Sequence, residues 1–395
     1  MTSCTRTNNT KPKRNVYLLG LVSLFTDLST EMIYPLIPAF LVSIGVSKSI
    51  IGLIEGIAES TASVFRVLFG RLSDKFGKRK FFVYFGYGLS AFSRPLFYLA
   101  NIWPIVLMIR FVDRLGKAVR TPARDALIST SVPATEKGTA FGIHRAMDTL
   151  GAIIGPLMAM LVLTLFNNNI RFVFLFSFVP AVIALVFIRF VRETKIERRD
   201  KMTAGQAYSI RNTPFMIFLV ANVIFALGNS SNAFLILKAR EAGLSVAMIP
   251  VIWIVYNCLY AITSPIFGLL SDSIGRKPFI IFSFIYYSAV YFLFGIAQNL
   301  WHIWILFGAY GVYYGMSEGI FRAYIADLVD PENRATAYGL FNTGIGLALL
   351  PASLIMGVVW DVYGSKWAFL TSAGFSFLGF LIFLISLIIT RTRKQ

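Results

Sequence analysis

Two pairs of acidic residues interrupt the first two apolar stretches of the chain. Asp27 and Glu31 lie four residues apart in the first stretch, and Glu55 and Glu59 repeat this spacing in the second. Residues with this spacing share one face of a helix, and two carboxyl groups on one face in an apolar medium cannot both ionise cheaply. At such a site, at least one of the two carboxyl groups can both bind and release a proton near neutral pH. Asp27, Glu31 and Glu59 are therefore candidates for proton coupling. Glu55, near the outer end of its stretch, is expected to contact water.

Five arginines inside apolar stretches offer the opposite charge. They are Arg66, Arg94, Arg110, Arg114 and Arg145. Arginines of the fourth stretch can neutralise Asp27 and Glu31 as structural ion pairs, which is the alternative to proton carrying. Arg110 can instead hold an anionic substrate or neutralise an acid of the first stretch. Arg145 lies three residues before Asp148 in the fifth stretch, so these two are expected to pair.

The second half of the chain offers neutral polar groups in place of charges. Its apolar stretches contain the acid Glu318 together with several asparagine and tyrosine residues. Such side chains can shape a pocket for a small organic molecule. The candidates for substrate binding are Arg110, Asn229, Asn232, Tyr256, Asn257 and Glu318.

Twelve apolar stretches position these side chains. A helix needs about 20 apolar residues to cross the hydrocarbon core of a bilayer, and lipid offers the backbone no hydrogen-bond partner. The sequence therefore predicts an all-α integral membrane protein with twelve transmembrane helices. The expected spans are residues 16–43, 49–70, 81–100, 104–125, 138–165, 172–191, 213–236, 247–270, 279–298, 301–324, 336–359 and 367–390.

The basic residues are distributed as in a membrane protein. The chain carries 37 Lys and Arg against 19 Asp and Glu, and most of the basic residues fall in segments on one side of the predicted membrane. An excess of Lys and Arg in short loops marks the cytoplasmic side. Both termini are therefore expected in the cytoplasm. The same distribution argues against nucleic acid as a partner, because the basic residues are confined to short loops between spans.

A polar segment divides the chain into two halves that repeat each other. The expected parts are a tail at 1–15, six-helix bundles at 16–191 and 213–390, a linker at 192–212 and a tail at 391–395. The sequence GRLSDKFGKRKF at 70–81 returns as GLLSDSIGRKPF at 268–279. Two parallel six-helix halves imply a substrate site between them near the middle of the bilayer, reached as one half rocks against the other.

The repeated loop resembles the signature loop of the major facilitator superfamily. The matching residues include Gly70, Asp74, Lys75, Gly77 and Arg79 in the first copy, and Asp272 and Arg276 in the second. In the second copy, Ser273 stands where the first has a basic residue. The resemblance implies that the loop controls access from the cytoplasm. Asp74 is expected to pair with a cation of the fourth stretch and to hold that side closed.

The fourth and fifth stretches carry two further motifs similar to those of this superfamily. The fifth contains a glycine row ending in Gly-Pro that resembles a motif of antiporter members, although Ala159 and Met160 stand in place of its last two glycines. The fourth contains RFVDRLG, loosely similar to an arginine motif. Together with the loop residues, we expect gating to involve Asp113, Arg114, Arg145, Asp148, Gly151, Gly155 and Pro156. Asp113 and Arg114 are expected to brace the cytoplasmic gate with Asp74.

The resemblance covers nearly the whole chain and implies a secondary transporter that works by alternating access. The fifth-stretch motif and the acids of the first two stretches favour proton-coupled antiport that exports a small organic molecule, such as a drug or a metabolite. The alternative is uptake of an anionic solute, such as an organic acid or a polycarboxylate siderophore, which the arginines favour. Export of a cation predicts a cavity dominated by acids, whereas anion uptake predicts that Arg110 faces the cavity.

Other functional classes lack their motifs. The sequence contains no GxxxxGK[ST] pattern for ATP, and its two histidines, His144 and His302, lie far apart along the chain. We therefore expect no enzyme activity, no bound metal, and no cofactor beyond a proton gradient. The expected partners are a small-molecule substrate, the proton and the lipid bilayer. The resemblance implies a functional monomer in a bacterial inner membrane.

Overall fold

The computed structural model describes residues 11–193, 213–330 and 333–392, and its regular elements are helices. Those of the first half are α1 (Lys11–Ile33), η1 (Tyr34–Leu36), α2 (Ile37–Ser43), α3 (Lys48–Phe76), α4 (Arg79–Ser93), η2 (Arg94–Leu99), α5 (Trp103–Thr130), η3 (Ala134–Glu136), α6 (Lys137–Leu165), α7 (Ile170–Phe176) and α8 (Phe178–Phe190). Those of the second half are α9 (Thr213–Gly228), α10 (Ala233–Glu241), η4 (Val246–Met248), α11 (Ile249–Ile274), α12 (Arg276–Ile296), α13 (Leu300–Leu328), α14 (Arg334–Tyr363) and α15 (Ser365–Thr392).

Within the described residues these helices form twelve spans, as the sequence predicts. Some spans are two helices in succession because a proline interrupts the backbone hydrogen bonds: Pro35 lies in η1 between α1 and α2, and Pro95 lies in η2 after α4. In the part of the chain that the structure describes, eight helical segments are long and apolar enough to cross a membrane by length and composition alone. The helices α3 and α5 are not among the eight, and both carry charged side chains of the site described below.

The first and last spans are longer than the sequence predicts. Helix α1 begins at Lys11, inside the expected tail, and α15 continues to Thr392, two residues past the expected end at 390. Lys and Arg favour helix and can extend their charged ends from a helix terminus toward water, so polar flanking residues can lengthen a span. The expected linker at 192–212 falls almost wholly outside the described residues.

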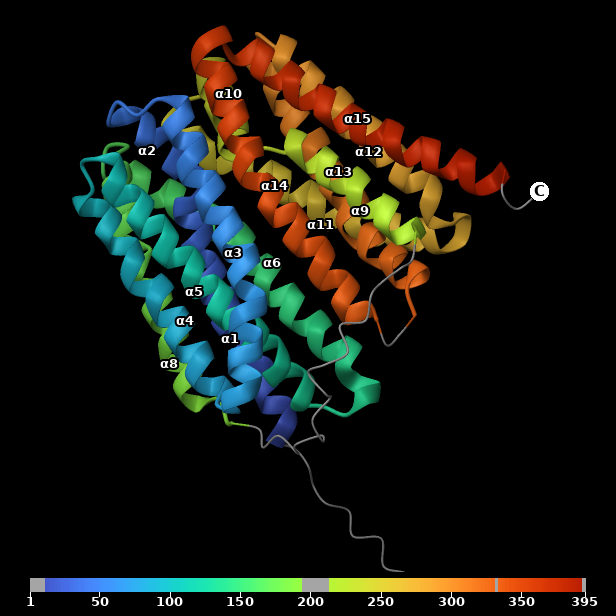
Figure 1. The fold of residues 1–395 in the computed structure, drawn as a ribbon. Helices are drawn as coiled ribbons and strands as arrows, with labels where there is room; N and C mark the ends of the chain where they lie inside the picture. The colour runs from blue at the N-terminus through green and yellow to red at the C-terminus, as the bar shows by residue number, and fades with distance from the viewer. Residues whose placement is uncertain (1–10, 194–212, 331–332, 393–395) are drawn as a thin grey trace, which may run out of the picture.

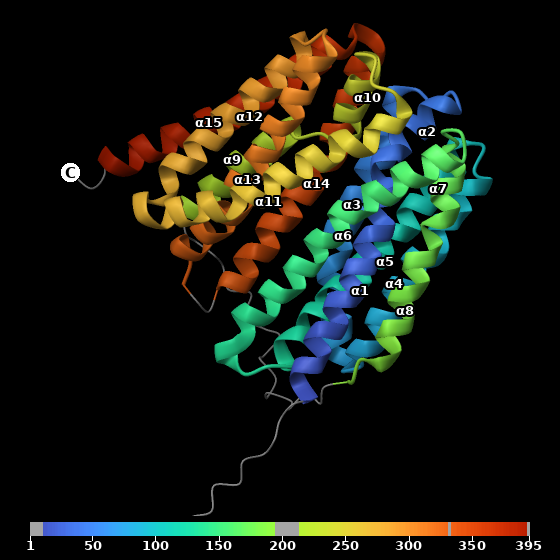
Figure 2. The same ribbon diagram turned by 180° about the vertical axis from the view of Figure 1, so that it is seen from behind.

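The spans assemble into two bundles, one built from α1 to α8 and the other from α9 to α15 (Figure 1). Helix α1 begins and α15 ends where the two bundles spread apart, and the repeated loops at 70–81 and 268–279 lie at these same bundle ends (Figure 1). We call this the basic end and the opposite one the distal end. Seen from both sides, the two bundles lie close together at the distal end and diverge toward the basic end (Figures 1 and 2).

Helices α3 and α14 form the main seam between the bundles. Glycines bring the two backbones close: a Cβ on Gly52 would meet the carbonyl oxygen of Ser353, and one on Gly357 would meet that of Lys48. Lower on the seam, the hydroxyl of Ser60 donates to the carbonyl of Gly346 at 2.7 Å. Small residues permit this close approach in a membrane, where helix pairs are held by packing and by polar contacts.

Helix α3 changes its surroundings along its length. Ile51 and Ile54, in its distal half, are completely buried, whereas Val67 and Leu68, nearer the basic end, are 40% and 49% exposed. The seam is therefore closed at the distal end, and α3 leaves α14 toward the basic end.

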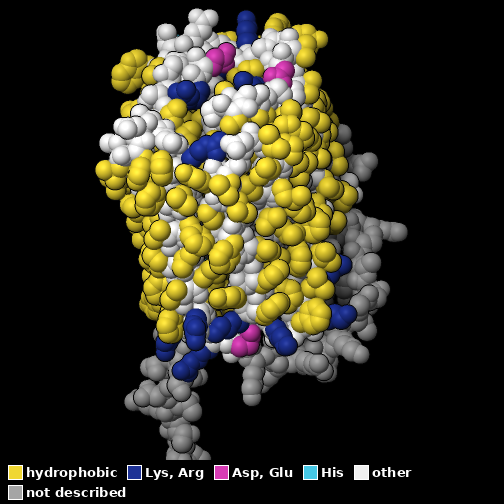
Figure 3. Space-filling view, turned by 90° about the vertical axis from the view of Figure 1, so that its left-hand side faces the viewer, with side chains coloured by type: hydrophobic (Ala, Val, Ile, Leu, Met, Phe, Trp, Pro, Cys, Tyr) yellow, Lys and Arg dark blue, Asp and Glu magenta, His cyan; other side chains and the backbone are white. Residues whose placement is uncertain are grey.

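The outer surface of the first bundle suits a bilayer. Figure 3 shows a continuous field of hydrophobic side chains over this face, with Lys and Arg gathered at its two ends. Exposed apolar residues such as Phe85, Phe92, Met108 and Val186 contribute to the lipid-facing surface of the helices. A band of this kind, bounded by charged ends, is typical of a protein that spans a membrane.

Within the first bundle, α6 packs closely on α1. A Cβ on Gly155 would lie 2.6 Å from the carbonyl oxygen of Leu28, and one on Gly151 would meet the carbonyl oxygen of Leu24. Pro156 follows inside the helix. Asp148 lies one turn before Gly151 and so shares the face of α6 that contacts α1. The close packing of α1 and α6 brings together acidic residues that are far apart in the sequence.

Candidate functional site

A polar cavity of about 310 Å³ lies between the two bundles. Helices α1, α3, α5 and α6 form its wall on one side, and α11 with the residue before α10 forms the other. The lining residues are Asp27, Thr30, Glu31, Tyr34, Glu59, Asp113, Arg114, Lys117, Arg120, Arg145, Asn232, Trp253, Tyr256 and Asn257. Hollows of about 500 and 440 Å³ lie at the distal end and between α4 and α5, and neither is lined by these residues.

The carboxyl group of Asp27 on α1 faces the carboxyl group of Asp148 on α6 within hydrogen-bonding range. Asp148 also accepts a hydrogen bond from the hydroxyl of Ser23 at 2.5 Å. An ionised carboxyl group only accepts hydrogen bonds, so two carboxyl groups can share one only when one of them carries a proton. The partner of Asp27 thus comes from another helix rather than from Glu31 on its own.

Glu31 joins the first bundle to the second. Its carboxylate accepts a hydrogen bond from the indole Nε1 of Trp253 on α11 at 2.7 Å. The Trp253 ring packs against Tyr34 of η1 and Tyr256 of α11, with ring centroids 5.5 and 4.8 Å apart. A carboxylate at the edge of three aromatic rings therefore forms part of the cavity wall.

Helix α5 carries a polar stripe that lines the cavity. Within it, Arg114 forms an ion pair with Glu59 of α3 at 2.9 Å, and Asp113 forms one with Arg94 at 3.4 Å. These partners differ from the expected one, because the sequence predicts that Asp113 and Arg114 brace the gate with Asp74. Each finds an opposite charge at its own depth in the bundle, and burial of a charge favours its nearest available counter-ion.

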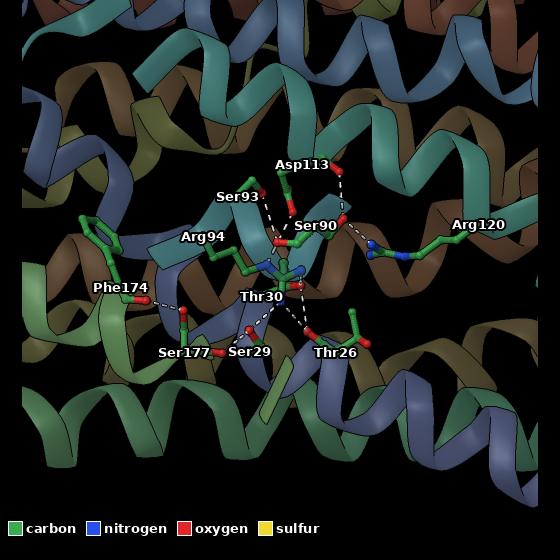
Figure 4. Close-up of polar contacts among 10 residues, drawn as sticks. All are labelled: Thr26, Ser29, Thr30, Ser90, Ser93, Arg94, Asp113, Arg120, Phe174 and Ser177. Atoms are coloured by element: carbon green, nitrogen blue, oxygen red, sulfur yellow. Dashed lines mark hydrogen bonds and ion pairs between the residues drawn. The ribbon is translucent and has the colours of Figure 1, made fainter. Parts of the chain in front are cut away.

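Arg94 sits at the centre of a buried network in the first bundle (Figure 4). Its guanidinium donates to the hydroxyls of Ser29 at 2.5 Å and Thr30 at 2.8 Å and to the carbonyl of Thr26 at 3.3 Å, besides its pairing with Asp113. These contacts join η2 to α1 and α5. A charged side chain with so many partners is held in one position, so the network makes the first bundle stiff.

Glu55 and Arg110 form a second buried ion pair, between α3 and α5. The Arg110 Nη2 lies 2.5 Å from Glu55 Oε2, and both side chains are almost fully buried. Ser231 of the second bundle donates to the same carboxylate at 3.3 Å. Two expectations are therefore corrected: Glu55 is not in contact with water, and Arg110 does not line the cavity. The reason is that α14 and the residues before α10 cover this part of α3.

The two loop copies make matching contacts inside their own bundles. Asp74 pairs with Arg79 at 3.3 Å, and Asp272 pairs with Arg276 at 3.4 Å. Arg79 donates to the carbonyl of Ala126, and Arg276 donates to that of Ala323 and to Asp327. The expected contact of Asp74 with a cation of α5 is replaced by the one with Arg79. The same geometry in both copies supports the internal repeat.

Arg145 of α6 contacts both bundles. It lies 3.4 Å from Asp148, the partner that the sequence predicts, and its other terminal nitrogen donates to the hydroxyl of Tyr260 on α11 at 2.7 Å. Glu318 of α13 lies 3.9 Å from Arg145 and accepts a short hydrogen bond from Tyr260. Glu318 is also paired with Arg322 at 2.8 Å. Glu318 therefore belongs to a polar group beside the cavity and is not among its lining residues.

The asparagine candidates divide into two groups. Asn229 and Asn232 accept hydrogen bonds from Tyr287 at 3.1 Å and Tyr310 at 2.6 Å, and of these two asparagines only Asn232 lines the cavity. Asn257 also lines it, and its amide nitrogen is buried without a hydrogen-bond partner among the described residues. An unpaired buried donor in a cavity wall is suited to bind a ligand acceptor or a water molecule.

Lys117 and Trp253 are lining residues that the sequence does not single out as site residues. Lys117 follows Arg114 by three residues on the polar stripe of α5, and Trp253 precedes Tyr256 by three on α11. Helical spacing from a candidate already chosen is the signal that identifies both. No cluster of three or more His, Cys, Asp or Glu suited to a metal occurs in the part of the chain that the structure describes.

The family model described as Major Facilitator Superfamily matches residues 19–228 and 217–395. An MFS-type transporter of Methanocaldococcus jannaschii, MJ1317, is 38% identical over 363 residues, which cover 90% of each chain. The multidrug resistance protein MdtG of Proteus mirabilis is 35% identical over 289 residues, which cover 70% of this chain and 71% of that protein.

Among solved structures, the D323A mutant of the nucleoside transporter NupG superposes with a TM-score of 0.80. The match covers 94% of this chain and 99% of NupG at 14% sequence identity, so it bears on the fold alone. The two six-helix bundles, the repeated loop and the central polar cavity agree with these matches. The chain belongs to the major facilitator superfamily and is a multi-pass secondary transporter of a small molecule.

Proposed function

We propose that this transporter is a proton-coupled antiporter that exports a small organic cation, a drug or a metabolite, from the cytoplasm. The observation that carries the proposal is the close pair of carboxyl groups, Asp27 and Asp148, beside the cavity between the bundles. The pair holds one proton and can lose it to water that enters the cavity. Its two states differ by one charge at the place where a substrate would bind.

The other lining residues favour a cationic substrate. Tyr34, Trp253 and Tyr256 offer aromatic faces, and Glu31 offers a negative charge beside them. Aromatic rings and a carboxylate together are a common way to bind an organic ammonium group. Multidrug resistance proteins are among the relatives, and their names agree with a broad organic substrate.

Anion uptake is the weaker alternative. It required Arg110 to face the cavity, and Arg110 is instead paired with Glu55 outside it. The lining cations Arg114 and Arg145 also have acidic partners. Of the other two lining cations, Arg120 donates to the hydroxyl of Ser90 at 2.5 Å. The side-chain amine of Lys117 has no hydrogen bond or ion pair among the described residues, and the charged groups around it include Asp27 and Glu59. An anion would have to compete with these carboxylates.

The proposed cycle uses one cavity for both ligands. A proton reaches the Asp27–Asp148 pair when the cavity is open at the distal end and leaves when it is open at the basic end, as in this structure. The substrate then binds from the cytoplasm and is carried outward. We place the basic end in the cytoplasm of a bacterial inner membrane because of its Lys and Arg. The proton gradient drives the cycle without a bound cofactor, and one chain contains a complete carrier.

The test uses purified protein in liposomes that contain a pH-sensitive dye. Adding a lipophilic cation such as tetraphenylphosphonium should release protons through the parent protein. Asp27→Asn should abolish this proton movement while leaving exchange of labelled for unlabelled cation across the membrane. Asp330→Asn, at an exposed position of the basic end, is the control and should behave as the parent. Unchanged proton release by Asp27→Asn and by Asp148→Asn would overturn the proposal.

A further inference from the structure

We propose that Arg145 is the residue that transmits the protonation state of the Asp27–Asp148 pair to the opposite bundle, through Tyr260 and Glu318. The inference rests on the proposed proton coupling. It adds the side chain through which loss or gain of the proton changes the position of one bundle relative to the other. It makes Arg145 a positioning residue, because it acts on the arrangement of the bundles and not on the transported molecule.

The geometry places one guanidinium between two acidic groups on different bundles. One terminal nitrogen of Arg145 faces Asp148 at 3.4 Å, and the other donates to Tyr260 at 2.7 Å with Glu318 at 3.9 Å. The contact with Tyr260 also brings the guanidinium within 6.0 Å of the ring centroid. Arg145 is thus a direct polar link between α6 and the second bundle on the cavity wall.

Each acid also has a partner of its own, so neither depends wholly on Arg145. Asp148 is held by Ser23 and Asp27, and Glu318 is held by Tyr260 and Arg322. The side chain of Arg145 is 56% exposed to the open cavity, whereas that of Arg94 is 1% exposed. Arg145 can therefore move between its partners, while Arg94 is fixed by its network. In this structure Arg145 contacts both partners at once, and a side chain that can favour either partner is suited to act as a switch.

The repeat gives independent support. In the match of residues 138–142 with residues 335–339, the position that corresponds to Arg145 in the second half is Asn342. The loop arginines, by contrast, occur in both halves and make the same contacts in both. Arg145 therefore lies between the two bundles without a charged counterpart in the second half. It is not part of the architecture that the two halves share.

Other charged groups also face the carboxyl pair and contribute to its response to pH. They are Glu31 of α1, Arg94 of α4–η2, Lys117 and Arg124 of α5, and His144 and Arg145 of α6. Within this set Arg145 is the member with a polar contact to Tyr260 and Glu318 of the second bundle. A change of charge on the pair can thus act through Arg145 on α11 and α13.

The sign of the effect follows from Coulomb's law. With its proton, the pair carries one negative charge, and Arg145 is shared with Tyr260 and Glu318, which holds the bundles in the arrangement open at the basic end. When the proton leaves to water, the pair carries two negative charges and draws Arg145 toward Asp148. The link to the second bundle weakens, and the carrier is free to open at the distal end once substrate is bound.

The experiment measures the distance between the bundles at the basic end by pulsed electron paramagnetic resonance. Spin labels on Phe76→Cys of α3 and Ile274→Cys of α11, both exposed, report this distance in protein whose Cys4 and Cys258 are replaced by serine. In liposomes without substrate, the parent should shift toward the long distance as the pH falls. Asp27→Asn keeps one negative charge on the pair, so it should stay at the long distance at every pH.

Arg145→Gln should abolish the pH-dependent shift, and Arg145→Lys should restore part of it because the positive charge returns. Glu318→Gln should reduce the shift in the parent and have no further effect in Arg145→Gln. Arg66→Gln, which removes another arginine of a membrane-spanning helix, is the matched control and should keep the shift. A full shift in Arg145→Gln and in Arg145→Lys alike overturns the inference.

The two proposals can fail separately. If Asp27→Asn and Asp148→Asn both keep the pH-dependent shift of the parent, the carboxyl pair is not the proton site and the proposed function is wrong. If these two variants lose the shift while Arg145→Gln keeps it, the pair senses the proton but Arg145 does not transmit it. If Arg145→Gln is poorly folded, Arg145→Lys and Glu318→Gln provide the same comparison.

Discussion

Asp361 of α14 caps the first turn of α3, on the opposite bundle, through Ser49. Its carboxylate accepts hydrogen bonds from the backbone nitrogen of Ser49 at 2.7 Å and from the Ser49 hydroxyl at 2.6 Å. The other carboxylate oxygen accepts from the backbone nitrogen of Lys48 at 3.0 Å. The first amides of a helix have no partner within it and carry a partial positive charge. This contact therefore fastens the two bundles at the distal end.

Removing the cap should shift the carrier toward the arrangement open at the distal end. A lost helix cap costs roughly 1 kcal/mol, which is about a fivefold change in the ratio of the two arrangements. We expect Asp361→Ala to raise the rate at which a membrane-impermeant maleimide labels a cysteine placed at Ala39 of α2. Asp361→Asn retains an acceptor oxygen and should label at a rate close to that of the parent. Equal labelling of all three proteins would show that the cap does not hold the distal end closed.

The buried pair of Glu55 and Arg110 should be sensitive to loss of one member and tolerant to loss of both. Removing one partner of a buried ion pair leaves an uncompensated charge and costs about 3–5 kcal/mol, whereas replacing both by uncharged groups is often neutral. Glu55→Gln and Arg110→Met should each lower the melting temperature in detergent, and the double variant should recover most of the loss. Additive losses in the double variant would mean that the two side chains are not coupled.

The glycine face of α6 should resist larger side chains where it meets α1. Gly155→Val places atoms against the backbone of Leu28 and should reduce the yield of folded protein by severalfold. The matched control is Gly142→Ala on the same helix, where an added Cβ meets no atom within 4 Å. Size-exclusion profiles of the two detergent-purified variants give the comparison. A monodisperse Gly155→Val protein with parental yield would contradict the packing described here.

Trp253 should contribute to substrate affinity through its ring and, separately, through its indole nitrogen. A cation over an aromatic face gains roughly 0.5–2 kcal/mol, so Trp253→Ala should raise the KM for a lipophilic cation by about two- to thirtyfold. Trp253→Phe keeps a ring but removes the hydrogen bond to Glu31, and should have an intermediate effect. Transport of labelled tetraphenylphosphonium provides the measurement. Identical KM values for all three proteins would remove Trp253 from the substrate site.

The twelve helices could be predicted from the sequence because the lipid bilayer offers the backbone no hydrogen-bond partners. Each apolar stretch must satisfy its backbone internally, so the twelve spans follow from hydropathy, and the repeated loop indicates the two halves. The predicted ends of the spans were less accurate. Helices α1 and α15 are both longer than predicted, because Lys and Arg can extend a helix into water. Helical spacing also connects Lys117 to the predicted residue Arg114, which it follows by three residues on α5.

Contacts between helices could not be derived in the same way. Glu55 looks exposed when its depth is judged along α3 alone, and it is buried because Arg110 and Ser231 approach it from other helices. Asp27 has an acid four residues away, yet the carboxyl group that faces it is that of Asp148, which lies on α6 and approaches because α6 packs closely on α1. Spacing along a helix defines faces, and only the packing of helices decides what each face meets.

The glycine seam between α3 and α14 has a consequence for the speed of transport. Where Gly52 and Gly357 let backbone meet backbone, few long side chains interlock, so separating the helices requires few rotamer changes. The barrier to reorientation then depends mainly on a few polar contacts, such as those of Asp361 and Glu31, rather than on the length of the seam. We therefore expect single substitutions at these contacts to change the turnover number.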